Sequence, residues 1–422
     1  MSLLLTLSIP TLAVLGGLAT GVGPLFLFRL AVPFLLLLTL VTRRKGVENR
    51  SELRRWIMLA VAIWVLSSLM LLIFKSTDMF MAGRELASVF TGLALIVTMM
   101  LGPLDSETIR VWTRGWLIAY LVTVAVCVWE LVSGRHASNY YYYVLDLPSR
   151  AYTGAIAGTL GNPNSLAFFL MASIFILFLG YSYELSPKGR WAYLIAMLPI
   201  PLLMEATDSR LMLGVLAATI VLYTVMWKPP LLFVVVPGFL IGVIVAMMNH
   251  AALFGAIGLD IATDASIAVR VNLILNGFAF AVETHMLGLG PGGFESRMER
   301  GAPYPAAATH NPHSGFIEIL AQYGAVVAIV SAVVLIAAAV IGFRRWKSKS
   351  EPESMRVAGT SVALAVLSLP VLSLASSSTL DLSFPWVFVG IILLAAAVME
   401  RDDGRINARI SFGYAGSRAG AR

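Results

Sequence analysis

The chain has 422 residues, of which 59% are hydrophobic and 13% are charged, and its mean hydropathy is +0.85. Soluble domains carry about 25% charged residues, so this composition excludes an ordinary soluble enzyme. The net charge of +7 does not indicate nucleic acid, because most basic residues flank apolar segments. The single cysteine, Cys127, lies in an apolar run, which excludes an internal disulfide and a cysteine-based metal site.

Twelve apolar segments are long enough to cross a membrane as α-helices. In chain order they are residues 2–22, 23–42, 56–75, 86–103, 115–134, 165–184, 191–207, 208–227, 231–248, 316–342, 358–376 and 385–399. No basic residue precedes Arg29, so we expect the first segment to be an uncleaved membrane helix rather than a signal peptide. The sequence predicts an all-α polytopic membrane protein forming a single membrane domain over residues 1–422.

The basic residues predict the orientation of these helices. With both termini in the cytoplasm, the loops on that side and the cytoplasmic tail 400–422 hold 21 of the 30 Lys and Arg residues. The positive-inside rule favours this arrangement, and we expect a multi-pass protein of the inner (cytoplasmic) membrane. Two long segments, near 135–164 and 249–315, then face the periplasm, and long loops of this kind usually carry function.

The long periplasmic loop 249–315 contains two features. The stretch Ser266–Thr284 alternates apolar blocks with polar residues, which predicts an amphipathic helix at the membrane interface. The stretch Gly288–Gly293 is a glycine-rich turn. A phosphate-binding loop is disfavoured there, because no strand precedes the turn and no lysine follows at the required spacing.

Two histidines, His310 and His313, lie at the entrance of the tenth segment, and Glu318 follows five residues after His313. A histidine with a pKa near neutrality is a natural general base for a hydroxyl. Metal binding is an alternative, but Pro312 interrupts the helical spacing and no further cluster completes a ligand set. A purely structural role, with a loop histidine capping the helix, is as well supported by the spacing alone.

Two arginines are candidates for binding an anion. Ser209 and Arg210 lie between two apolar runs with almost no loop, at the outer membrane surface, and Arg270 lies on the amphipathic stretch. Charged residues at membrane depth are usually functional, and guanidinium groups match phosphate oxygens. Ion pairing of Arg210 with Asp208 or Glu205, or snorkelling to lipid headgroups, are the structural alternatives.

The stretch Gly161-Asn162-Pro163-Asn164-Ser165 precedes the sixth segment. This pattern predicts a turn and a helix N-cap, which is the reading we favour. Hydrogen bonds from Asn162 and Asn164 to a sugar or phosphate are the alternative.

Together these motifs resemble the superfamily of O-antigen ligases and polymerases, which are integral-membrane glycosyltransferases. The ligase signature is a histidine followed by Asn, Ser or Gln, nine residues, and Gly-x-x-Gly. His313-Ser314, nine residues and Gly324 fit this spacing, whereas the same count from His310 reaches Ala321. The second glycine of the signature is replaced by Val327.

The resemblance extends to the Ser209-Arg210 pair, the Asn162 turn, and Arg270 with the glycine-rich turn. It implies an O-antigen ligase of lipopolysaccharide biosynthesis that transfers a glycan from undecaprenyl diphosphate to a hydroxyl of lipid A–core in the periplasm. His313 is then the general base of an inverting reaction. Arg210 and Arg270 bind the diphosphate, and the remaining predicted substrate contacts come from Ser209, Asn162, Asn164 and His310. We expect no metal, no cofactor and no nucleic-acid partner; the expected partners are the lipid-linked glycan, the acceptor and membrane lipid.

Three other functions remain open. A surface-polysaccharide polymerase and an oligosaccharyltransferase acting on protein hydroxyls share the chemistry but use different acceptors. A transporter or flippase fits twelve helices, but transporters usually place their ionisable groups at the bilayer midplane. Here the candidate residues gather at the outer ends of helices.

Overall fold

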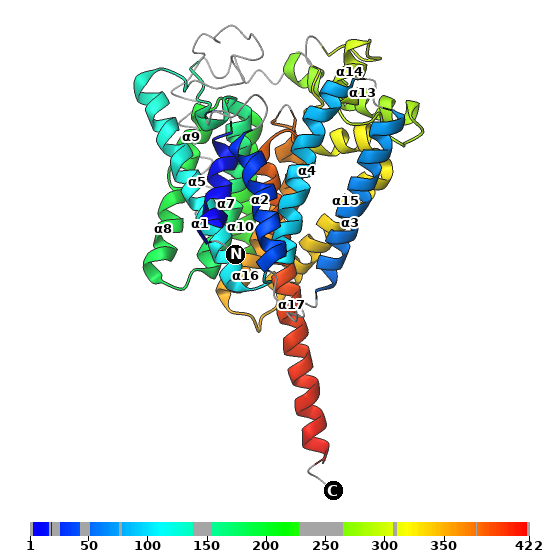
Figure 1. The fold of residues 1–422 in the computed structure, drawn as a ribbon. Coiled ribbons are helices and arrows are strands. Elements are labelled where there is room, and N and C mark those ends of the chain that lie inside the picture. Colours follow the sequence, from blue (N-terminus) through cyan, green and yellow to red (C-terminus); the bar gives the residue numbers. More distant parts are fainter. Residues whose placement is uncertain are drawn as a thin grey trace.

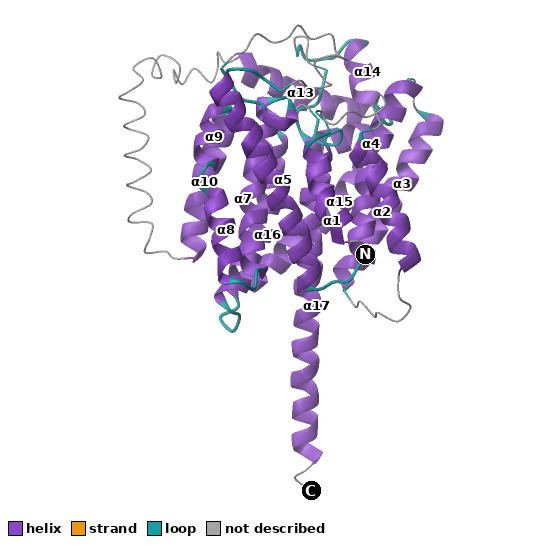
Figure 2. Ribbon diagram, turned by 60° about the vertical axis from the view of Figure 1, so that its left-hand side comes forward, coloured by secondary structure: helices purple, strands orange, loops and turns teal. Residues whose placement is uncertain are grey.

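The computed structural model describes residues 3–16, 18, 26–42, 51–75, 78–137, 154–227, 265–306, 310–376 and 378–419. Throughout these residues the regular elements are helices, and no strand occurs among them (Figures 1 and 2). The helices pack side by side as a bundle, from which the C-terminal part of the last helix projects at one end (Figure 1).

Seven helices in the described part of the chain are long and apolar enough to span a membrane. They are α3 (Glu52–Phe74), α4 (Met79–Leu101), α5 (Ser106–Ser133), α7 (Pro163–Tyr183), α15 (Gly315–Lys347), α16 (Glu353–Ser373) and α17 (Ser383–Ala419), the last through its portion Ser383–Asp402. Three shorter apolar helices join them: α1 (Leu3–Val14), α2 (Leu27–Thr42) and α10 (Arg210–Trp227). The protein is therefore an all-α, polytopic integral membrane protein.

The predicted segment 191–207 is not a single continuous helix. Residues 191–207 form two short helices, α8 (Pro187–Met197) and α9 (Ile200–Ala206), because Pro199 and Pro201 interrupt the backbone hydrogen bonding. The predicted segment 231–248 lies outside the described residues.

Capping side chains mark the starts of α4 and α5, which begin at Met79 and Ser106, before the predicted starts at residues 86 and 115. Asp78 accepts hydrogen bonds from the backbone N–H groups of Phe80 and Met81 at the start of α4. Asp105 accepts from the N–H of Thr108 at 2.8 Å at the start of α5. These carboxylates satisfy N–H groups that have no partner inside the helix, which fixes the first residue of each span.

Burial separates central helices from peripheral ones. Side chains of α7 and of the apolar part of α17 are buried along nearly their whole length, whereas few of those in the apolar stretches of α3 and α15 are buried. The exposed positions of α3 and α15 are mainly Leu, Ile, Val and aromatic residues. These faces suit contact with lipid tails, so α7 and α17 form the centre of the bundle and α3 and α15 part of its surface.

One end of the bundle carries α9 and two further helices, α13 (Ala265–Glu283) and α14 (Gly293–Glu299), opposite the projecting end of α17 (Figure 1). We call it the site end. The helix α13 coincides within one residue at each end with the predicted amphipathic stretch Ser266–Thr284.

The helix α15 is broken near the site end. Gly324 has φ 84° and ψ 175°, so the segment predicted as one continuous helix over 316–342 is wrong at this point. The N–H of Ala325 donates to the carbonyl of Met286 at 2.8 Å instead of to Ala321, and the carbonyl of Ala321 accepts from Leu289 at 2.9 Å. The glycine-rich turn thus supplies the hydrogen bonds that the break removes.

Candidate active site

His313 lies at the site end, immediately before the N-cap residue Ser314 of α15, and its backbone is left-handed with φ 47°. No side-chain hydrogen bond caps this helix, so His313 does not have the capping role that the spacing alone allowed. Its Nδ1 atom is buried and has no hydrogen-bond partner among the described residues. Buried polar atoms are normally paired, so an unpaired imidazole nitrogen is available for a ligand.

The surroundings of His313 keep its imidazole neutral. Burial lowers the pKa of His313 to about 4, and the positive charge of Arg270 lowers it as well, while hydrogen bonding with the backbone of Ser376 acts in the opposite direction. A group with this pKa is deprotonated at neutral pH and can accept a proton. Sequence reasoning placed His313 and Arg270 in one site, and in the structure the charge of Arg270 acts on this imidazole.

The helix α13 holds Arg270 on this side of the molecule. Asn276 donates to the carbonyl of Tyr304 at 2.8 Å and accepts from its N–H at 2.9 Å. A Cβ atom on Gly277 would overlap the side chain of Ile317, so α13 and the start of α15 are in very close contact there. The segment that leads to His313 is therefore fixed both to α13 and to α15.

Two buried carboxylates, Glu85 on α4 and Glu318 on α15, connect the elements around His313. Glu85 accepts hydrogen bonds from the hydroxyl of Tyr323 at 2.6 Å and from the N–H of Gly292 at 2.7 Å. Glu318 accepts from residues between α16 and α17. Glu85 was not predicted, since its partners are more than 200 residues away and no local pattern marks it.

A small polar cavity of about 20 Å³ lies among these groups. Pro312, next to His313, forms part of its wall, and so does an ion pair between Arg84 and Asp381 at 2.7 Å. Burial raises the pKa of Glu295, another lining residue, although Arg84 opposes this shift. A space of this size holds about one water molecule. Among the described residues, no group of three His, Cys, Asp or Glu side chains is placed to hold a metal ion.

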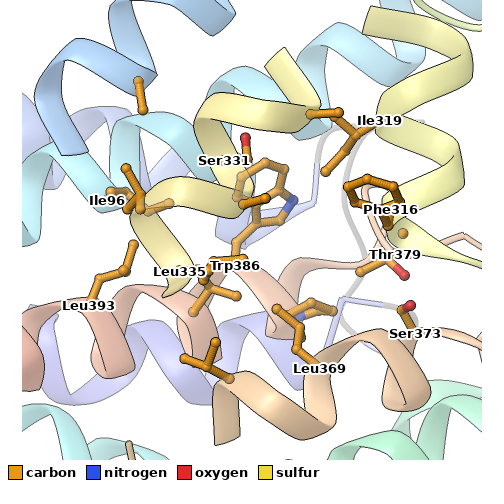
Figure 3. Close-up of a pocket in the computed structure, with 18 of the residues that line it drawn as sticks. Ile96, Phe316, Ile319, Ser331, Leu335, Leu369, Ser373, Thr379, Trp386 and Leu393 are labelled. Carbon is orange, nitrogen blue, oxygen red and sulfur yellow. The ribbon is translucent and has the colours of Figure 1, made fainter. Parts of the chain in front are cut away.

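A much larger apolar cavity of about 420 Å³ is lined in part by Gly315, two residues after His313. Gly315, Phe316 and Thr379 line it at the site end, and Trp386 and Leu393 on α17 line it further into the bundle (Figure 3). The helices α3, α4, α15, α16 and α17 all contribute to its walls. Its volume is within the range of about 300–1,000 Å³ that is typical of ligand sites, and its apolar walls suit a hydrocarbon chain.

The second predicted arginine, Arg210, begins α10 and is exposed at the same end of the bundle. Ser209 beside it is buried, and the preceding Asp208 has a left-handed backbone with φ 54°. The N–H of Ile156 donates to the carbonyl of Ala206 at 2.9 Å, which ties the segment before α7 to this turn.

The other predicted contacts have structural partners. The side chain of Asn162 accepts from the N–H of Asn164 at 2.9 Å and of Ser165 at 3.3 Å, which is the N-cap that the sequence favoured. Asn164 is half-buried beside it. His310 is partly exposed, and its Nδ1 lies 3.9 Å from a carboxylate oxygen of Glu299.

Two comparisons with known proteins show what the chain is similar to. Residues 192–331 match the model of a family described as O-antigen ligase, a range that contains Arg210, Arg270, His313 and Gly324. The chain is also 23% identical over 375 residues to the teichuronic acid biosynthesis protein TuaE of Bacillus subtilis (strain 168), covering 84% of this chain and 76% of that protein. The chain is therefore similar to the O-antigen ligases and polymerases, and these similarities indicate a membrane enzyme of the glycosyltransferase kind in polysaccharide biosynthesis.

Proposed function

We propose that the protein is an O-antigen ligase that transfers a glycan from undecaprenyl diphosphate to a sugar hydroxyl of lipid A–core at the periplasmic face of the inner membrane. The observation that carries this proposal is the position of His313. A neutral imidazole with an unpartnered nitrogen lies near a fixed positive charge, that of Arg270, and two residues before Gly315, which lines a large apolar cavity. A lipid diphosphate needs an apolar site, a cationic site and a reactive centre at their junction.

In the proposed reaction, His313 accepts the proton of the acceptor hydroxyl. The hydroxyl oxygen then forms a bond to the anomeric carbon, and the bond from that carbon to the diphosphate oxygen breaks with inversion. The electron pair leaves with undecaprenyl diphosphate, whose developing charge Arg270 and Arg210 stabilise. The diphosphate linkage itself supplies the driving force, and no metal or cofactor takes part.

Arg270 links donor binding to the basicity of His313. In the empty site its positive charge helps to keep the pKa of His313 near 4, which makes the imidazole a weak base. A bound diphosphate offsets this charge and thereby raises the pKa of His313 toward neutrality. The base is then strongest when the donor is present.

Replacing His313 tests this role. Asparagine tolerates a left-handed backbone, so His313→Asn removes the imidazole with little strain. We expect glycan transfer in proteoliposomes to fall by about 10²-fold to 10⁴-fold, as for loss of a general base. The matched control is His285→Asn, because His285 is also left-handed with φ 53° but is exposed. Full activity of His313→Asn would refute the proposed mechanism.

A polysaccharide polymerase is the second candidate. It is favoured by the relative TuaE, a protein of teichuronic acid rather than lipopolysaccharide biosynthesis. The two functions differ in the acceptor, so the products of cells that lack the protein separate them. Lipid-linked polymer that accumulates without transfer indicates a ligase, whereas products with a single repeat unit indicate a polymerase.

A further inference from the structure

We propose that Glu318 is a positioning residue for His313 and acts by holding the described residues between α16 and α17, 374–376 and 378–382, against it. We call this segment the α16–α17 loop. The inference rests on the proposed role of His313 as the base. It gives Glu318 a role different from metal binding, the alternative raised by the sequence.

The carboxylate of Glu318 binds the α16–α17 loop through both of its oxygens. Ser378 donates its hydroxyl to Oε1, and the N–H groups of Thr379 and Leu380 donate to Oε2 at 2.9 and 3.3 Å. Only 3% of Glu318 is exposed. Two consecutive backbone N–H groups in a loop need a buried acceptor, and this one carboxylate provides it.

The loop held in this way contacts the imidazole of His313 and the start of α15. A Cβ atom on Gly315, two residues after His313, would lie 2.9 Å from the hydroxyl oxygen of Thr379, so the loop touches the start of α15. Ser376, in the same loop, interacts with the imidazole through its backbone. The loop therefore contacts the reactive ring through Ser376, and Glu318 holds the following residues of the loop in place.

Two observations explain why the backbone of His313 needs support and why Glu318 supports it only indirectly, through the loop. The left-handed backbone of His313 is strained for a non-glycine residue and persists only where its surroundings fix it. All three donors to Glu318 come from the α16–α17 loop, and among the described residues no hydrogen bond joins Glu318 to His313 itself. Glu318 thus sets the geometry of the base without exchanging a proton with it.

The test compares Glu318→Ala with Glu318→Gln. The amide oxygen of glutamine can accept from both N–H groups and its NH₂ group can donate to Ser378, so the loop keeps its anchor. Alanine leaves both N–H groups unpaired. We expect kcat of Glu318→Ala to fall by about 10²-fold with KM for the lipid-linked donor nearly unchanged. Glu318→Gln should stay within about threefold of the parent enzyme.

The matched control is Glu184→Ala. Glu184 is also a buried carboxylate that accepts two consecutive N–H groups, those of Leu185 and Ser186, at 3.0 and 3.2 Å. It lies at the opposite end of α7 from Asn162 and pairs with Arg114. Its loss should leave kcat of the folded protein unchanged, which separates a positioning effect from general loss of a buried carboxylate.

A double substitution separates the two proposals. If Glu318 acts through His313, then Glu318→Ala causes no further loss in the His313→Asn background. An additive loss would overturn the positioning role, and so would equal losses in Glu318→Ala and Glu318→Gln. Activity that persists in His313→Asn would instead overturn the proposed function. Should Glu318→Ala fail to fold, Ser378→Ala removes one of the three bonds, and its smaller loss of kcat must show the same non-additivity.

Discussion

At the scale of single residues, two histidines in the same backbone conformation differ in their surroundings. His285 and His313 have φ values of 53° and 47°, but His285 is exposed, whereas the ring of His313 has a buried nitrogen without a partner. The sequence signature selects His313 over His310, and in the structure burial and the charge of Arg270 lower the pKa of His313. Its left-handed backbone and its contact with Ser376 left no sign in the sequence.

The pH dependence of transfer is a prediction at this scale. His313 must be neutral to act as a base, and its pKa in the empty site is about 4 rather than the ordinary value near 6.5. Activity limited by this group therefore persists as the pH falls through 6.5, and it is lost only as the pH approaches 4. We expect kcat/KM to be nearly constant from about pH 8 to pH 5.5.

Substitution of Arg270 should reverse part of the lowering of the His313 pKa. Arg270→Met removes a positive charge beside the imidazole, so the pKa of His313 rises and the acid limb of the residual activity moves to higher pH. The measurement is kcat/KM for transfer in detergent or proteoliposomes across this range. An acid limb near pH 6.5 in the parent enzyme would show that a solvent-exposed group, not the buried His313, controls the rate.

At the scale of elements, the break in α15 explains the spacing of the signature motif. The nine residues after Ser314 form a separate helical piece, and Gly324 then reverses the backbone so that the glycine-rich turn can bind to it. The sequence predicted the turn and the spacing, but it also predicted an unbroken helix. Apolar periodicity continues through the break, and the partner that permits the break, Met286, is distant in sequence.

Substitution of Gly324 tests the importance of this break. A Cβ atom on Gly324 would collide with the carbonyl of Leu287, and φ of 84° is unfavourable for other residues. We expect Gly324→Ala to lower the stability of the folded protein by about 1–3 kcal/mol and to reduce transfer. Gly214→Ala is the control, because nothing lies within 4 Å of a Cβ placed there. Equal melting temperatures of the two variants would contradict this interpretation.

Most helices were predictable for a simple reason. Hydrophobic segments and the N-cap at Asn162 are local signals, and they located most of the described spans, but the predicted starts at residues 86 and 115 fall inside helices that begin at Met79 and Ser106. The contacts of Glu85 and Glu318 join helices that are far apart in the sequence, so a single sequence contains no pattern that reveals them.

At the scale of the whole molecule, the apolar cavity is formed by residues of five helices and was not predictable from any of them alone. Filling it should weaken binding of the lipid. Ala332→Phe places a ring in the cavity, and we expect KM for an undecaprenyl-linked donor to rise by about tenfold, with less effect on a donor with a short lipid. Val333→Phe is the control, because Val333 is next in sequence but 54% exposed. Equal effects of both substitutions would argue against a lipid in this cavity.

The orientation of the bundle is also a property of the whole molecule, and a labelling experiment tests it. The native Cys127 is buried and does not compete. A cysteine at Tyr304, at the site end, should react with a membrane-impermeant maleimide once the outer membrane is permeable. A cysteine at Lys349, between α15 and α16, should react only after the inner membrane is opened. The reverse pattern would place the site in the cytoplasm and exclude the proposed function.

The position of the apolar cavity has a consequence for the length of the product. Gly315 and Thr379 line the cavity near the proposed base, and the cavity continues into the bundle. In the proposed ligase reaction, a donor held by its lipid would place the first sugar at the same depth, whether a few or many repeat units follow it. Such a site would gain no binding energy from additional repeats, so the length distribution of the polysaccharide would be set before the donor reaches a ligase of this kind.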